Sequence, residues 1–264
     1  MENRISIEVK NKVAYVTMQR EDKFNAVDLD MLDAHIAAAR KISKDKSIRA
    51  VILSGKGKAY CSGLDFPSVT KNYTRGFLGF LKRYKGGTNK FQEVAWCWRK
   101  LPIPVISVIH GYCFGAGAQI ALASDFRFIT PDCQFSIMEA KWGMIPDMSG
   151  TASLRELLPI DQAKKLIMTG ETISGEEAFK LNLATGISTD PMKLAEELVD
   201  KLITRSPDSV AATKKLLHET WHAEEEEAFS RERMIQLKIL LGKNQKIAMN
   251  ANFKKEQPQF LDRK

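Results

Sequence analysis

The chain has 264 residues, of which 44% are hydrophobic and 27% charged, and its formal net charge is +8. This length can bury the core of one large domain, and the composition is that of a soluble globular protein, which excludes collagen-like, low-complexity and largely disordered chains. The lysines are spread along the chain rather than massed in one run, so the charge does not indicate a nucleic-acid-binding face.

Strands and helices alternate along the first 190 residues. Apolar and polar side chains alternate from residue 5 as in a pair of strands, and 103–111 is a β-branched run typical of a strand buried on both faces. Residues 69–88 are aromatic and basic and show no clean period. The alternation predicts an α/β core over 1–190. Its predicted strands are 5–20 (a pair), 49–55, 103–111, 126–130 and 134–138, and its predicted helices are 27–42, 89–101 and 115–125.

The C-terminal third carries helical periodicity throughout, so we expect a helical subdomain over 191–264. Its segment 225–242 offers more apolar surface than one exposed helix normally shows. We therefore expect a homotrimer or hexamer. The apolar residues of this segment are Phe229, Met234, Leu237, Ile239, Leu240 and Leu241.

A His-Glu-x-x-His pattern, "HETWH", occupies residues 218–222. On one helix His218 and His222 would share a face and could bind zinc, with Glu219 as general base. The acidic residues that follow come too soon after His222 to supply a third ligand unless the helix breaks. We therefore expect a chance pattern and no metal site.

The cysteines and the first residues indicate the compartment. The 4 cysteines form no C-x-x-C pair and predict reduced, mostly buried thiols. No basic stretch precedes an apolar segment at the start of the chain, so we expect neither a signal peptide nor a membrane span. A cytoplasmic protein fits both observations.

Two glycine-bearing turns follow predicted strands, at 58–66 and 110–125. Small residues there let the backbone approach a ligand, and free N–H groups at a helix start favour negative charge. Neither the dinucleotide-binding nor the phosphate-loop glycine spacing occurs. A third segment, 135–151, carries Glu139 and Asp147. Two acids beside an anion-stabilising turn suit proton transfer next to a carbonyl, because the enolate needs N–H donors and the proton needs a base.

These motifs together resemble the crotonase, or enoyl-CoA hydratase/isomerase, superfamily. The resemblance rests on "RxxxxNA" at 20–26, "YCSGLD" at 60–65, "GYCFGAGAQIALASDFRF" at 111–128 and "FSIMEAKWGMIPDMSGT" at 135–151. It implies a crotonase-like spiral of β-β-α units, a C-terminal helical oligomerisation subdomain that builds trimers or dimers of trimers, and a site for acyl-CoA thioesters. Coenzyme A is then part of the substrate, and no separate cofactor is expected.

The resemblance also assigns residues to roles. The backbone N–H groups of Leu64 and Ala116 correspond to the family's oxyanion hole, which holds the thioester oxygen. Ser62 and Asp65 match the chain beside the adenine of CoA. Lys23, Phe24 and Ala26 match the segment along its pantetheine and phosphates.

Two departures from the hydratase pattern affect the expected reaction. Gln119 replaces one of the two glutamates that activate water in hydratases, and Asp147 stands where hydratases usually carry glycine. In the family's isomerases the residue matching Glu139 removes a proton, and an acid matching Asp147 assists in dienoyl-CoA isomerases. The resemblance thus favours an enoyl- or dienoyl-CoA isomerase. The alternatives are a hydratase using Glu139 with Gln119, or a CoA-binding relative without catalysis.

Overall fold

The structure is a computed structural model that describes residues 4–264. It begins with an antiparallel hairpin of β1 (Ile5–Lys10) and β2 (Val13–Met18), as the alternating sequence predicts. The turn between them is Asn11–Lys12, and both residues have positive φ, 49° and 67°. Turns of this kind match the right-handed twist of the flanking strands.

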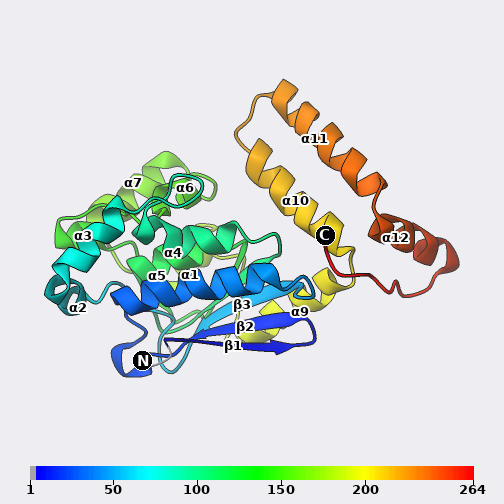
Figure 1. Ribbon diagram of the computed structural model, residues 1–264. Coiled ribbons are helices and arrows are strands. Elements are labelled where there is room, and N and C mark those ends of the chain that lie inside the picture. The colour runs from blue at the N-terminus through cyan, green and yellow to red at the C-terminus, as the bar shows by residue number, and fades with distance from the viewer. Residues whose placement is uncertain (1–3) are drawn as a thin grey trace.

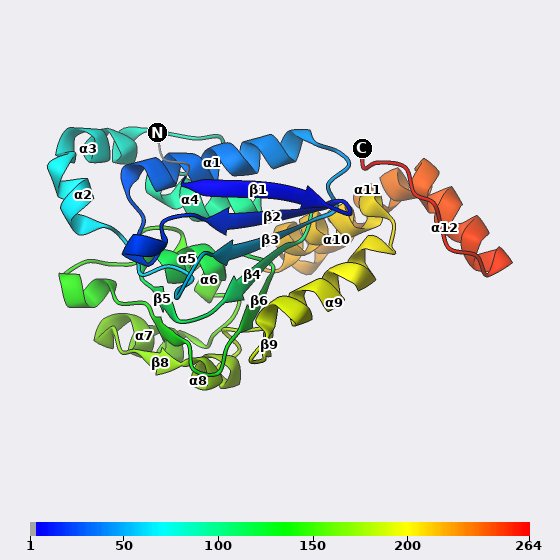
Figure 2. The ribbon, with the colours of Figure 1, turned by 90° about the horizontal axis from the view of Figure 1, so that it is seen from below.

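The hairpin forms one edge of a six-stranded sheet with the order β1-β2-β3-β4-β6-β9 (Figures 1 and 2). Every pair after β1–β2 is parallel. Parallel sheets are covered on both faces, which explains the apolar, β-branched strands. The remaining strands of this sheet are β3 (Ala50–Gly55), β4 (Val105–Ile109), β6 (Phe126–Ile129) and β9 (Gly186–Ile187).

Helices cover both faces of the sheet. The side chains of Val51 and Leu53 join the larger core with α1 (Leu29–Lys44) and α4 (Lys90–Arg99), whereas Ile52 faces α9 (Pro191–Ile203). The helix α9 therefore packs on the sheet, although the sequence groups it with the C-terminal helices. The helices that project from the core begin after it (Figure 1): α10 (Pro207–Thr220), α11 (Glu225–Leu240) and α12 (Lys243–Lys254).

A second, three-stranded sheet lies beside the first and carries the glycine-rich segment. Its strands are β5 (Tyr112–Phe114), β7 (Gln134–Ser136) and β8 (Ile173–Ser174). The result is the mixed α/β architecture expected from the sequence. The short helices around this sheet are η1 (Glu21–Lys23), α5 (Ala116–Leu122), η2 (Glu139–Trp142), α6 (Gly150–Leu154), α7 (Ile160–Thr169) and α8 (Gly175–Lys180).

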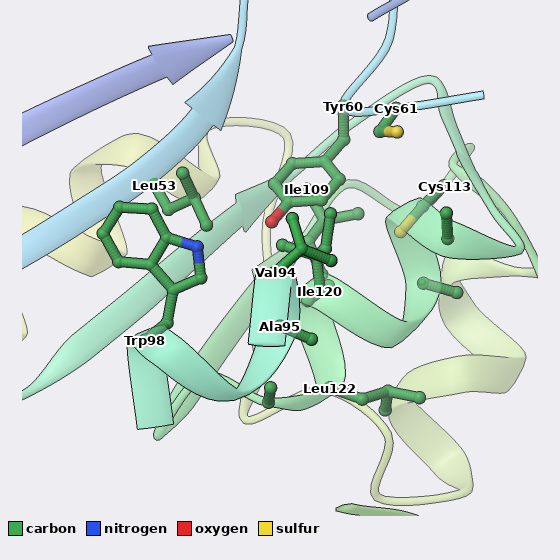
Figure 3. Packing of buried hydrophobic residues seen from close by; sticks show 14 of the residues in the cluster. Leu53, Tyr60, Cys61, Val94, Ala95, Trp98, Ile109, Cys113, Ile120 and Leu122 are labelled. Atoms are coloured by element: carbon green, nitrogen blue, oxygen red, sulfur yellow. The ribbon is translucent and has the colours of Figure 1, made fainter. Parts of the chain in front are cut away.

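The core anchors the strand ends that lead into the glycine turns. Figure 3 shows Trp98 of α4 and Tyr60 in one packed cluster with Leu53, Ile109 and Ile120. The Trp98 indole N–H donates to His35 Nδ1 (3.1 Å), so the buried indole keeps a hydrogen bond. Tyr60 and Ser107 share another, at 3.1 Å. The packing and the hydrogen bond of Tyr60 therefore fix the position of the segment that follows it.

The stretch 69–88, which shows no period in the sequence, contains helical structure. It contains the second half of α2 (Phe66–Lys71) and all of α3 (Tyr73–Leu81). Glycines at 76 and 79, which favour a helix only weakly, lower the helical signal of α3 in the sequence. Within residues 4–264, no helix combines the length and the apolar character needed to cross a membrane.

Candidate active site

The two glycine-bearing turns lie side by side. Cys61 and Cys113 form a parallel bridge, in which the N–H of Phe114 donates to the Cys61 carbonyl (2.9 Å) and the N–H of Cys61 to the Tyr112 carbonyl (3.0 Å). A Cβ atom on Gly117 would come within 2.6 Å of the Cys61 Cβ. The close approach of α5 to the first turn therefore requires glycine at 117.

Leu64 and Ala116, the predicted oxyanion residues, each lie three positions after a cysteine of this bridge. The residue before each is a glycine with positive φ, 101° at Gly63 and 48° at Gly115. Within residues 4–264, no group accepts a hydrogen bond from the backbone N–H of Leu64 or of Ala116. Both residues line one cavity of about 370 Å³. Two residues whose N–H groups are not used within the described fold therefore border the same cavity.

Glu139 and Asp147 line the same cavity. The Glu139 side chain comes from the first turn of η2 and is only 6% exposed. Its Oε2 atom has no hydrogen-bond partner among the described residues. The sequence-predicted acids are therefore brought together with the two free N–H groups.

Gln119 lies behind Glu139 and is not among the residues that line the cavity. Its Nε2 donates to Glu139 Oε1 (2.6 Å), and its Oε1 accepts from the N–H groups of Met148 (2.9 Å) and Gly150 (3.0 Å). A Cβ on Gly150 would approach Gln119 Oε1 to 2.7 Å, so a larger residue there would displace the Gln119 amide. The amide ties the loop that carries Asp147 to the carboxyl of Glu139.

Burial alters both carboxyls in the cavity. It raises the pKa of Glu139 above its ordinary value; the nearby Asp147 carboxylate adds to the rise, and the hydrogen bond from Gln119 opposes it. Burial also raises the pKa of Asp147. Carboxyls with raised pKa exchange protons closer to neutral pH, which is the property that general acids and bases need.

The predicted CoA-binding residues form a surface turn beside the cavity. Phe24, 42% exposed and with φ 49°, follows η1, and its carbonyl accepts from the N–H of Ser62 (2.9 Å). Lys23 is exposed and Ala26 half-buried. Asp65 has structural contacts: its carboxylate pairs with Arg20 (2.7 Å) and accepts from the N–H of Ser68 at the start of α2 (3.1 Å). Ser62 lines the cavity and joins it to this turn.

The HETWH pattern does not lie on one helix, because α10 ends at Thr220 and the exposed His222 lies beyond it. His218 instead approaches Asp125 (Nε2 to Oδ1, 3.7 Å), and burial, with help from Arg99, lowers its pKa to about 4. Among residues 4–264, no cluster of three or more His, Cys, Asp or Glu is arranged to hold a metal ion.

The residues that sequence reasoning missed are the aromatic side chains of the cavity wall. The signal was present as "GFLGF" at 76–80, where glycines and phenylalanines alternate at helical spacing. The family resemblance places residues 69–87 along the acyl pocket, but the stretch shows no clean period, so no individual side chain could be singled out from the sequence. The aromatic lining consists of Phe66, Tyr73, Phe77, Phe80, Phe91 and Trp142.

Comparison with known proteins identifies relatives across the whole fold. The enoyl-CoA hydratase/isomerase family profile matches residues 8–263. An (E)-benzylidenesuccinyl-CoA hydratase of Thauera aromatica is 31% identical over 222 residues, covering 80% of each chain. A short-chain-enoyl-CoA hydratase of Clostridium acetobutylicum is 28% identical, covering 96% of this chain and 95% of its own. The crystal structure of an enoyl-CoA hydratase from Polaromonas sp. JS666 superposes with a TM-score of 0.87 at 25% identity, covering 97% of this chain and 99% of the other.

Proposed function

Because this chain belongs to the enoyl-CoA hydratase/isomerase family, we propose that it moves the double bond of an enoyl- or dienoyl-CoA through a thioester enolate. The observation that carries the proposal is the composition of the cavity. Two carboxyls and two unpaired backbone N–H groups reach it, while the amide that replaces a hydratase glutamate lies behind. The chain therefore offers a base, an acid and an oxyanion hole.

The N–H groups of Leu64 and Ala116 bind the thioester oxygen. Removal of a proton from the adjacent carbon moves negative charge onto this oxygen, where fixed donors stabilise it without changing protonation. A donor of this kind is worth about 10²- to 10³-fold in rate. Since both donors are main-chain groups, a leucine at 64 and an alanine at 116 can supply these hydrogen bonds as well as other residues could.

Glu139, as the carboxylate, removes the proton at C2 of a 3-enoyl-CoA. The electron pair of the broken C–H bond forms the C1–C2 double bond of a dienolate and moves the C1=O electrons onto the thioester oxygen. When the carbonyl re-forms, the C1–C2 pair becomes the C2–C3 double bond, and the electrons of the former C3–C4 double bond bind a new proton at C4. Asp147, protonated, delivers that proton, and proton exchange with water restores both carboxyls. Gln119 holds Glu139 in place and so is a positioning residue.

Hydration is the second candidate, and the names of the relatives favour it. The relatives of Thauera aromatica and Clostridium acetobutylicum are both named hydratases. The free Oε2 of Glu139 could take a proton from water that adds to a 2-enoyl-CoA. The missing second carboxylate at 119 argues against this reaction.

The two reactions are separated by an assay of one enzyme preparation with 2-enoyl-, 3-enoyl- and 3,5-dienoyl-CoA. We expect migration of the double bond in a 3-enoyl or 3,5-dienoyl substrate and slow hydration of the 2-enoyl substrate. Rapid hydration of crotonyl-CoA with no migration would replace the isomerase by the hydratase. Binding of all three thioesters without conversion would indicate the relative without catalysis.

We further propose a cytoplasmic homotrimer or hexamer that needs no cofactor beyond the CoA of its substrate and binds neither nucleic acid nor membrane. Exposed apolar side chains on α11 support the assembly, among them Phe229 (58% exposed) and Leu237 (61%). Light scattering at micromolar concentration tests it, and a monomer would contradict it.

A further inference from the structure

Aromatic rings form much of the cavity wall, and they stand in neighbouring pairs. The rings of Phe80 on α3 and Phe91 on α4 are stacked with centroids 4.3 Å apart. Those of Phe66 and Trp142 lie 4.5 Å apart at 34°. Tyr73 and Phe77 follow one another on α3. The wall therefore offers flat π surfaces from four different elements to whatever lies beside the thioester.

Several of these rings are unusually exposed for side chains that line a cavity. Phe77 is 51% exposed, Phe80 46% and Trp142 59%. Leaving large apolar rings in contact with water forfeits the free energy that their burial would release. An apolar ligand group in the cavity would cover them.

A second, independent observation is the glycine at position 76, which lies inside the helix α3 and lines the cavity. It and Gly79 are the buried residues of α3, although glycine weakens a helix interior. At Gly79 a Cβ would come within 3.3 Å of Phe91 Cε2, so close packing of α3 on α4 explains this glycine. At Gly76 a Cβ would meet only Val69 Cγ1, at 3.7 Å. Packing therefore does not require glycine at 76. Because Gly76 lines the cavity, the absence of a side chain there enlarges the cavity.

The lining contains no charged group apart from the two carboxyls. Its other polar side chains are Ser62, Thr70 and Tyr73. An anionic acyl end would lose its hydration without gaining a cationic partner among the described lining residues. The cavity favours an uncharged, apolar group.

Resting on the proposed function, we infer that the substrate is an aryl-substituted acyl-CoA, whose ring lies among these aromatic side chains, and that Gly76 sets the space for the ring. Rings at offset-stacked or edge-to-face distances of ~4.5–7 Å attract one another beyond simple area burial. A ring is also rigid, and so loses less conformational freedom on binding than an alkyl chain of equal carbon number.

Calorimetric binding of saturated, unreactive thioesters tests the preference without relying on catalysis. We expect 3-phenylpropanoyl-CoA to bind about tenfold more tightly than butanoyl-CoA, and more tightly than nonanoyl-CoA, which has the same number of acyl carbons. Equal or reversed affinities would overturn this inference and leave the proposed function standing. Failure of all three to bind would overturn both.

Substitutions on α3 test the role of Gly76. Gly76→Leu should weaken binding of 3-phenylpropanoyl-CoA about tenfold or more and leave butanoyl-CoA unaffected. Leu78→Ala, on the 58% exposed outer side of the same helix, is the matched control and should change neither. Should Gly76→Leu lose both ligands, Gly76→Ala decides: selective weakening of the aryl ligand supports the inference, and an unchanged preference overturns it.

Discussion

Two cavities of the molecule contain buried ionisable side chains, which form ion pairs in one cavity and have no oppositely charged partner in the other. Between the core and α10, the lining of a cavity of about 720 Å³ includes two ion pairs, Lys214 with Asp125 (2.6 Å) and Arg99 with Glu156 (2.5 Å). In the 370 Å³ cavity, Glu139 and Asp147 have no cationic partner in the described structure, and burial raises the pKa of both. Paired charges hold elements together, whereas unpaired carboxyls are available for proton transfer. The larger cavity is therefore not the better candidate for chemistry.

The largest effect on activity should come from substitution of the two unpaired carboxyls in the 370 Å³ cavity. Glu139→Gln keeps the shape and the contact with Gln119 but removes the base, so double-bond migration should fall by about 10²- to 10⁴-fold. Asp147→Asn should weaken it severely but less. Steady-state kinetics with a 3-enoyl-CoA measures both. Activity of Glu139→Gln close to that of the unaltered enzyme would remove Glu139 from the mechanism.

In the 720 Å³ cavity, by contrast, breaking an ion pair should lower the stability of the protein. Lys214 is buried and also donates to the Ile103 carbonyl (2.9 Å). Lys214→Met would leave the Asp125 carboxylate, 13% exposed, without its ammonium partner and should cost about 3 kcal/mol of unfolding free energy. Denaturant titration measures this loss. An unchanged denaturation midpoint in Lys214→Met would show that this ion pair does not stabilise the fold.

Gln119 links the two regions, because it is buried and hydrogen-bonded within the fold, and one of its hydrogen bonds is to Glu139, the proposed base. Gln119→Ala should reduce migration by about 10- to 100-fold through misplacement of Glu139. Its hydrogen bond opposes the rise in the pKa of Glu139, so its loss should move the acidic limb of the rate profile to higher pH. Gln119→Met, which retains volume without the amide, should shift the limb in the same direction. A limb that stays in place would limit Gln119 to packing.

The pH dependence of stability sharpens the same contrast. A raised folded-state pKa means that the folded protein holds these protons more tightly than the unfolded chain. The unfolding free energy therefore falls as pH rises from the ordinary carboxyl values, 4.5 for Glu139 and 3.8 for Asp147, through their folded-state values. Glu139→Gln and Asp147→Asn should lessen that fall and be at least as stable as the unaltered protein at neutral pH. Denaturant titrations across this pH range measure it, and a steeper fall in the variants would contradict the shifts.

The smallest effect is expected at His218. His218→Ala should leave acyl-CoA conversion unchanged, because this side chain approaches Asp125 in the larger cavity and not the acids of the smaller one. Metal analysis of the same preparation should find no stoichiometric zinc. Zinc that disappears together with activity in this variant would overturn the whole interpretation.

The sequence predicted those strands and turns that are determined by residues close together in the chain. The β-branched run before Gly111 can only be a buried strand in this context, and the glycines before Leu64 and Ala116 mark turns that expose main-chain donors. The placement of Gln119 could not be predicted, because it depends on how closely Gly150 approaches from a distant segment.

Two helical features also escaped sequence reasoning. The helix α3 was not predicted because its two glycines, which line the cavity or pack against α4, have low helix propensity. The end of α10 at Thr220, which separates the two histidines of HETWH, follows from no strong stop signal in the sequence. Both depend on tertiary packing, which local propensity does not report.

Deuterium exchange at C2 of a 3-enoyl-CoA in heavy water tests the central claim, that Glu139 removes the proton and Asp147 returns one at C4. Mass spectrometry of the recovered substrate and of the rearranged product follows the two steps separately. The account predicts that Asp147→Asn still exchanges C2 hydrogens but forms little product, and that Glu139→Gln does neither. Exchange that persists in Glu139→Gln, or unimpaired product formation in Asp147→Asn, would contradict it.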